Sequence, residues 1–232
     1  MGKQITILIL ILAPLTGWAQ QLYNSDINNP RYDDRRIVTY GFSIGTHTAS
    51  LRLKYSDYFT TPAMDSVHSI VPLKSPGFSL GFIANFKIAD FVDARITPKV
   101  TFSEYDLQYN YIGSTPSIET VESVSVDFPL MLKYKSQRRN NTRMYLIGGI
   151  TSSIEATGKT SLEEDLNVLQ FNGFDLLADF GFGFDLYYPL FKFSPEIRFA
   201  FGLTDITGSN NDFTVGIKEL KAKTISIYFH FQ

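Results

Sequence analysis

Hydrophobic and polar residues alternate along most of this chain, most clearly over residues 174–188, FDLLADFGFGFDLYY. The even positions of this stretch are apolar or aromatic, whereas the odd positions carry three aspartates, two glycines, a tyrosine and one leucine. Successive side chains of a strand point to opposite faces, so the pattern predicts a strand with one aromatic and one acidic face. The stretch exceeds the usual globular strand of about five or six residues, and strands of about ten residues suit a transmembrane barrel.

Seven further segments alternate in the same way, and we expect strands over residues 37–55, 77–88, 92–109, 122–135, 142–155, 191–201 and 223–232. The apolar parity shifts before Leu51 and before Tyr105, which indicates a bulge or a strand end that leaves the membrane. Pro98 cannot donate to a strand ladder and predicts a bulge or a local break. Short turns alternate with longer polar loops, which include residues 56–76, 158–170 and 205–221.

These features predict an all-β fold: an eight-stranded antiparallel up-and-down transmembrane β-barrel of the OmpX or OmpA type, with short periplasmic turns and longer outer loops. Such a barrel has no free edge, which a strand in lipid requires. We expect the aromatic face of each strand to contact outer-membrane lipid. The predicted lipid-facing residues are Phe78, Phe82, Phe86, Phe128, Leu130, Phe180, Phe182, Phe184, Phe193, Phe199, Phe229 and Phe231.

The opposite parity places charges of both signs in the lumen. The predicted inward charges are Lys87, Asp93, Arg95, Lys99, Asp127, Lys133, Asp175, Asp179, Asp185, Lys192, Glu196 and Arg198. The interior of an eight-stranded barrel is just wide enough for its own side chains, and unpaired buried charges are costly. We therefore expect a hydrogen-bonded ion-pair network that fills the lumen rather than an open pore. Asp175, Asp179 and Asp185 could alternatively chelate a hard cation.

The N-terminal segment predicts export. Lys3 and the apolar run 5–15 are followed by Gly17-Trp18-Ala19, so we expect a signal peptide over residues 1–19, cleaved before Gln20 and exported by the Sec pathway, rather than an uncleaved anchor helix. Residues 20–36 show no periodicity and predict an irregular periplasmic segment, either a disordered leader or a docking arm for a partner. The barrel then occupies residues 37–232.

Composition narrows the chemistry. The chain has no cysteine, which excludes disulfides, thiolate metal sites and a lipid-modified cysteine. A net charge of −2 does not favour nucleic-acid binding. His47, His68 and His230 lack the spacing of metal ligands. No helix follows Gly181 and Gly183, so these glycines do not indicate a nucleotide-binding loop. No motif that pairs a nucleophile with a base stands out in the sequence. We expect no enzyme activity, no cofactor, no metal and no small-molecule substrate, and we read the two glycines as space for bulky lumen neighbours.

Three stretches carry a family resemblance: NPRYDDRRIVTYGFSIG (residues 29–45), FPLMLKYKSQRRNNTRMYLIGGI (128–150) and YPLFKFSPEIRFAFG (188–202). Together with the leader and the eight-strand layout, they resemble the PorT (SprT) family of Bacteroidetes outer-membrane barrels over essentially the whole mature chain. The resemblance implies a non-enzymatic role in the type IX secretion system, which exports proteins across the outer membrane and in some species supports gliding. Other type IX secretion proteins are the implied partners.

Two other functions remain open from the sequence. A general small outer-membrane barrel with a structural or adhesive role would carry the same pattern. A soluble lipocalin-like binding barrel would also alternate, but with its apolar face inward. The choice between membrane and soluble barrels depends on which face closes inward, and we expect the phenylalanines to face outward.

Overall fold

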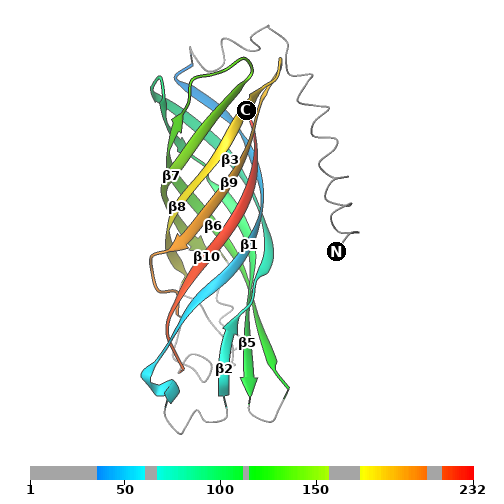
Figure 1. The fold of residues 1–232 in the computed structure, drawn as a ribbon, viewed down its shortest axis with the longest axis vertical. Coiled ribbons are helices and arrows are strands. Elements are labelled where there is room, and N and C mark those ends of the chain that lie inside the picture. Colours follow the sequence, from blue (N-terminus) through cyan, green and yellow to red (C-terminus); the bar gives the residue numbers. More distant parts are fainter. Residues whose placement is uncertain (1–35, 61–66, 112–114, 157–172, 208–215) are drawn as a thin grey trace, which may run out of the picture.

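The computed structural model describes residues 36–60, 67–111, 115–156, 173–207 and 216–232, which form a single antiparallel sheet (Figure 1). The predicted signal peptide and nearly all of the predicted segment 20–36 lie outside these residues. Within them, no helix is both long and apolar enough to span a bilayer. The elements are β1 (Val38–Tyr55), the short 3-10 helix η1 (Asp57–Thr60), β2 (Val67–Pro72), β3 (Ser75–Ala89), β4 (Val92–Ile96), β5 (Lys99–Tyr111), β6 (Ser117–Lys135), β7 (Thr142–Glu155), β8 (Phe174–Tyr187), β9 (Lys192–Gly202) and β10 (Ile217–Phe231).

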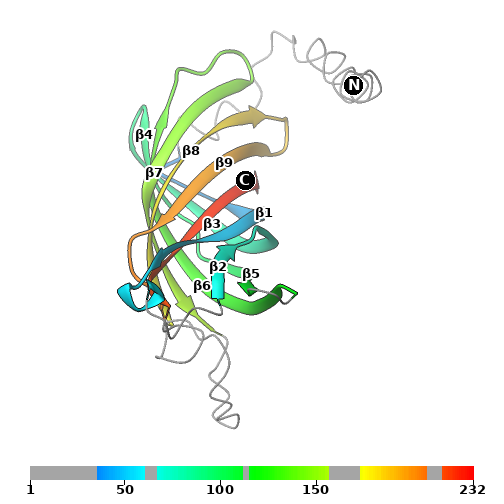
Figure 2. The same cartoon turned by 60° about the horizontal axis from the view of Figure 1, so that its bottom comes forward.

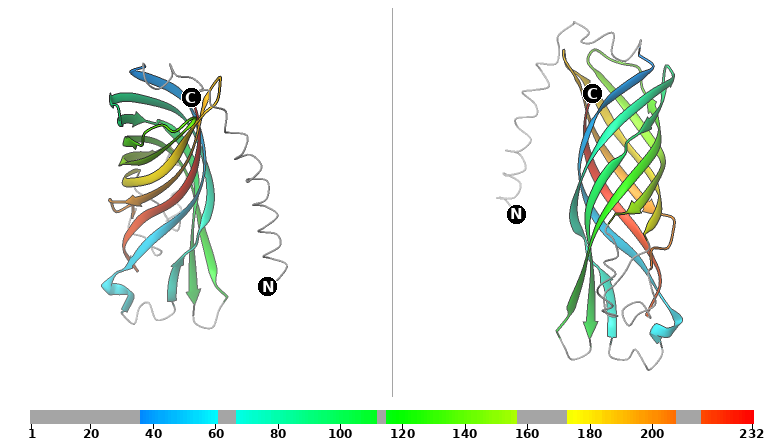
Figure 3. Two further views of the ribbon diagram at one scale, coloured as in Figure 1. Left: turned by 45° about the horizontal axis from the view of Figure 1, so that its top comes forward. Right: turned by 180° about the vertical axis from the view of Figure 1, so that it is seen from behind.

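The sheet closes on itself because β1 pairs with β10 on one side and with β3 on the other. Figure 2 shows the strands curving around a common axis, and Figure 3 shows the closed wall from the opposite side. β4 and β5 are two halves of one strand that is interrupted between Ile96 and Lys99, so the break predicted at Pro98 is confirmed. Counting them as one, the ring has eight strands, as the sequence predicts.

The connections alternate in length around the ring. Short turns join β3 to β4, β6 to β7 and β8 to β9 at the end where the C-terminus lies (Figure 1, top). The longer connections lie at the opposite end, where β2 pairs with β5 (Figure 1, bottom). Because short turns are periplasmic in outer-membrane barrels, we refer to these ends as periplasmic and outer.

The parity shifts in the first and third predicted strands are not bulges. β1 pairs with β10 without a register change from Phe42 to Lys54, and β5 pairs with β6 continuously. The strands keep their pleat, and the location of the apolar side chains changes instead: Leu51 and Leu107 are buried inside the ring. This agrees with the alternative reading, in which the strand leaves the membrane and no longer needs an apolar outer face.

The outer ends of the strands therefore have an apolar core of their own. Its buried members are Leu51, Ile70, Leu107, Tyr109, Ile206, Ile217, Leu220 and Ala222. Two predicted loops are wrong for this reason: residues 56–76 contain β2, and residues 205–221 contain the first part of β10. β6 likewise begins at Ser117, five residues before its predicted start. The loop predicted at 158–170 lies entirely outside the described residues.

Candidate functional site

The lumen at membrane level is organised around Glu196 of β9. Its carboxylate accepts a hydrogen bond from Arg95 Nη1 at 2.7 Å and one from Arg198 Nε at 3.0 Å. Tyr145 Oη donates to it at 2.9 Å, and His230 Nε2 lies 3.5 Å away. All of these side chains are buried. One carboxylate thus compensates two guanidinium groups within a closed ring of strands.

A second ion pair joins β6 to β8. Lys133 Nζ lies 2.7–2.8 Å from both carboxylate oxygens of Asp185, and neither side chain is exposed to solvent. Ser194 Oγ donates a further hydrogen bond to Asp185 at 2.7 Å. The ammonium group also lies 3.8 Å from the ring centre of Tyr145, a favourable cation–π position. Lys192, a further predicted lumen residue, is buried on the neighbouring strand β9.

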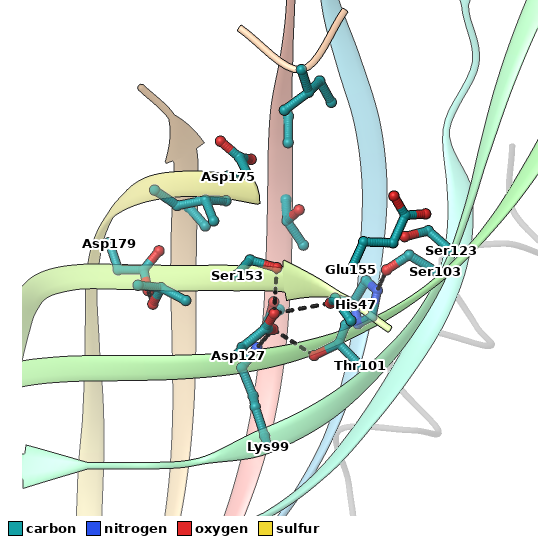
Figure 4. Close-up of a pocket in the computed structure, with 18 of the residues that line it drawn as sticks. His47, Lys99, Thr101, Ser103, Ser123, Asp127, Ser153, Glu155, Asp175 and Asp179 are labelled. Carbon is teal, nitrogen blue, oxygen red and sulfur yellow. Dashed lines mark hydrogen bonds and ion pairs between the residues drawn. The ribbon is translucent and has the colours of Figure 1, made fainter. Parts of the chain in front are cut away.

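A third group lies toward the outer end, around Asp127 (Figure 4). Lys99 Nζ lies 3.0 Å from this carboxylate and donates to Tyr228 Oη at 2.9 Å. Thr101 and Ser153 each donate to Asp127 at 2.6 Å, and Ser125 donates at 2.9 Å. The hydroxyl groups satisfy the carboxylate oxygens that a single lysine leaves free.

The remaining predicted lumen charges lie at the two ends of the network. At the periplasmic end, Asp93 pairs with Lys135 at 2.8 Å, and the partly exposed Lys87 pairs with the exposed Asp90 at 3.0 Å. Toward the outer end, Asp179 accepts a hydrogen bond from Thr151, and Asp175 accepts one from Thr204.

The structure does not favour the alternative in which three aspartates chelate a cation. Asp175, Asp179 and Asp185 lie along one strand at separations of four and six residues, which correspond to about 13 and 20 Å at the rise of a β-strand. Asp185 is in addition fully engaged by Lys133 and Ser194. In the part of the chain that the structure describes, no group of three or more His, Asp or Glu residues could hold a metal ion.

Two glycines make room for the tyrosines of the network. A Cβ atom on Gly183 would lie 2.5 Å from Tyr145 Oη, and one on Gly45 would lie 2.6 Å from the ring of Tyr228. Any side chain at these positions would displace a ring that contacts the buried charges. Gly181 instead faces the backbone carbonyl of Ile197 on β9. For Gly183, the expected role as space for a bulky neighbour fits the geometry.

A small cavity lies between the ion pairs and the apolar core of the outer end. Its volume is about 90 Å³, and most of the residues around it carry a hydroxyl or a carboxylate group (Figure 4). His47 Nε2 lies 2.9 Å from Ser103 Oγ in its wall, an arrangement that the sequence did not indicate. A hydrolytic triad needs a third group that orients the histidine, and in the described parts of the chain no carboxylate hydrogen-bonds the His47 ring.

The outer surface of the ring at membrane level is apolar. The side chains of Phe82, Phe180 and Phe182 are 73%, 54% and 44% exposed. By contrast, Asp179 of β8 is only 6% exposed, and Arg198 of the neighbouring strand β9 is 2% exposed. Phe78, Phe86, Phe128, Leu130 and Phe229 are also exposed, and Phe184, Phe193, Phe199 and Phe231 are partly exposed. The soluble lipocalin-like barrel is therefore wrong, because its apolar side chains would have to line the interior.

The sequence prediction omitted several uncharged or outlying members of the network. Tyr145, Tyr228 and His230 have the inward parity but carry no formal charge, and Lys135 lies at the last position of its strand. Their position in the alternating pattern could have identified them, because each is adjacent in the sequence to an exposed apolar residue and therefore points into the lumen. Their partners lie far away in the sequence and could not be predicted.

Comparison of the sequence with models of known protein families finds a match to one family. The model of the family described as "Outer membrane protein beta-barrel domain" matches residues 18–208. No curated protein matches the chain.

Solved structures with a similar fold include outer-membrane protein OprG from Pseudomonas aeruginosa, with 13% identity, a TM-score of 0.47 and coverage of 82% of this chain and 93% of that chain. Neisserial surface protein A has 12% identity, a TM-score of 0.41 and coverage of 83% and 97%. The outer-membrane enzyme PagL has 9% identity, a TM-score of 0.40 and coverage of 81% and 97%.

Proposed function

The chain belongs to the outer membrane protein β-barrel domain family, and from that premise we propose that it is a non-enzymatic accessory barrel of type IX protein secretion. It resides in the outer membrane, and its contribution to export is made through its surfaces and not through its lumen. The resemblance of residues 29–45, 128–150 and 188–202 to the PorT family supports the assignment to this pathway.

The filled lumen is the observation that carries the second part of the proposal. Glu196, Asp185 and Asp127 are each bonded to buried cations contributed by other strands, and these groups follow one another along the barrel axis. Opening a path for solute or polypeptide would require separating several buried ion pairs, each of which loses several kcal/mol when one partner is left alone. A protein built in this way acts by contact with other components.

Deletion of the gene tests the assignment to type IX secretion. We expect cargo to be lost from the cell surface and to accumulate inside the cell, while the profile of other outer-membrane proteins and resistance to detergent remain normal. Complementation with the intact gene should restore export. Normal surface cargo in the deletion strain would contradict the proposal and favour a general barrel with a structural or adhesive role, which the family membership equally allows.

A lumen variant tests action through surfaces. In Lys133→Met/Asp185→Asn, a buried ion pair is replaced without a change to any exposed residue, since both side chains are fully buried. We expect this variant to restore export in the deletion strain when it accumulates to the wild-type level. Loss of export at normal levels would contradict an exclusively external mode of action.

A further inference from the structure

Positive charge gathers on the outside of the barrel where β1 and β10 leave the apolar band. We name this group the outer basic patch, and it consists of Arg52, Lys54, Lys221 and Lys223. Arg52 lies directly opposite Lys221 in the β1–β10 register, and Lys54 lies opposite Glu219. The side chains project outward, because the intervening Leu51, Leu220 and Ala222 are buried.

The patch is not neutralised by its own acidic residue. Glu219 pairs with Lys221 at 2.6 Å and with Lys54, and hydrogen bonds from these two lysines lower the pKa of Glu219 to about 2. Within the described residues, neither Arg52 nor Lys223 has an ion-pair partner. Asp205 adds a second carboxylate beside the patch, since it accepts a hydrogen bond from the Leu220 amide at 3.0 Å. Four cations and two carboxylates leave a net charge of +2, and like charges directly across a strand pair are unfavourable without an anion between them.

The position of the patch relative to the membrane indicates the anion. Lys223 precedes Ile225 by two residues, about 7 Å along the strand, and lies opposite Phe201 of β9. Ile225 is 43% exposed and Phe201 40%, so both belong to the apolar band. The patch therefore begins two residues beyond the apolar band on the outer side, at the level of the lipid headgroups. The long lysine and arginine side chains can reach these headgroups from there.

Among the described residues, another wall of the barrel carries charge of the opposite sign at this end. On the β5–β6 wall, the first exposed outward residues beyond Phe102 and Val124 are Glu104 and Glu122, which lie directly opposite each other. A uniform ring of cations would suggest general attraction to an anionic surface. A basic group on two strands, with an acidic pair elsewhere on the rim, suggests recognition of a particular anionic group at one location.

We propose that the outer basic patch binds the phosphate groups of a lipid A-type glycolipid in the outer leaflet, while its acyl chains lie against the adjoining apolar band. Arginine can hold a phosphate through two parallel hydrogen bonds, and the lysines supply additional point charges. Phe201 and Ile225 offer the neighbouring apolar surface for the chains. The inference does not depend on a role in secretion.

Lipid binding to the purified full chain tests the proposal. The probe is lipid A with two phosphates, titrated in mixed detergent micelles against the wild type and against Arg52→Gln/Lys221→Gln/Lys223→Gln. Each cation near an anionic lipid contributes about fivefold to affinity, so we expect the triple variant to bind on the order of a hundredfold more weakly. The matched control is Arg139→Gln, which removes an exposed arginine from the periplasmic β6–β7 turn and should leave affinity unchanged.

Three further results complete the test. Lipid A without phosphates should bind the wild type about as weakly as the bisphosphorylated lipid binds the triple variant, and millimolar inorganic phosphate should not displace the lipid. Lys223→Gln alone, at an exposed position, should lose about fivefold. Equal binding by the triple variant, equal binding of phosphate-free lipid A, or displacement by free phosphate would overturn the proposal. Circular dichroism and heat-dependent electrophoretic mobility establish that each variant is folded.

Discussion

Substitution of Glu196 by glutamine gives the sharpest test of the lumen network. The change keeps the shape of the side chain and removes only its charge. Arg95 and Arg198, both no more than 2% exposed, then lose the carboxylate that lies 2.7 Å from Arg95 Nη1 and 2.5 Å from Arg198 Nη2. Removing one partner of a buried ion pair costs about 3–5 kcal/mol. We expect Glu196→Gln to reduce the free energy of unfolding by that amount.

The measurement is urea-induced unfolding of the barrel in lipid vesicles, followed by circular dichroism and by the mobility difference between folded and unfolded barrels. Lys87→Gln is the control, because Lys87 pairs with a largely exposed aspartate at the periplasmic rim and such pairs contribute about 0–1 kcal/mol. A loss below about 1 kcal/mol for Glu196→Gln would refute the reasoning, because it would mean that water or rearrangement solvates both guanidinium groups.

Three further outcomes follow from the same structure. Asp185→Asn should destabilise the barrel more than Lys133→Met/Asp185→Asn does, because the double variant leaves no buried ammonium group unpaired; unfolding midpoints in urea compare the two. The wild-type barrel in planar lipid bilayers should show no stable conductance steps, and recurrent open channels would contradict a filled lumen. Tyr55→Phe should accelerate hydrogen exchange at the Ile70 amide, because Tyr55 Oη bonds both the amide and the carbonyl of that residue and ties β1 to β2; unchanged exchange would show that the apolar core alone holds β2.

The membrane-spanning part of the fold could be predicted from the sequence because its requirements are local. In lipid, each outward position must be apolar, so alternation in the chain reports directly on the wall of the barrel. β7 has the predicted bounds, Thr142–Glu155, and β8 ends one residue before its predicted end. The interruption at Pro98 was equally local, since a missing N–H group can be read from the residue itself.

The outer ends could not be predicted in the same way. Beyond the bilayer, the outer face is polar and the inner face is apolar, so the apolar positions of the alternation mark the interior instead of the exterior. Leu51 and Leu107 therefore looked like slips in parity, although the register continues without a break. β2 is short and pairs only with β5 at the outer end, which gives no alternating signal long enough to recognise.

The individual contacts of the lumen were also beyond sequence reasoning. The parity of each strand places charges on the inner face, but it does not say which strands will bring them together. Arg95 meets Glu196 across 101 positions of the chain, and Lys99 meets Tyr228 across 129. These partners depend on strand order, stagger and tilt, which only the closed barrel determines.

The apolar interior of the outer ends affects how readily this part of the barrel can bind a partner from outside the cell. Leu51, Ile70, Leu107 and Leu220 hold β1, β2, β5 and β10 together without help from lipid. A binding partner that arrives from outside meets strands already fixed in place, so little conformational freedom is lost when the two associate. The outer ends of these strands therefore form a preorganised binding surface above the bilayer.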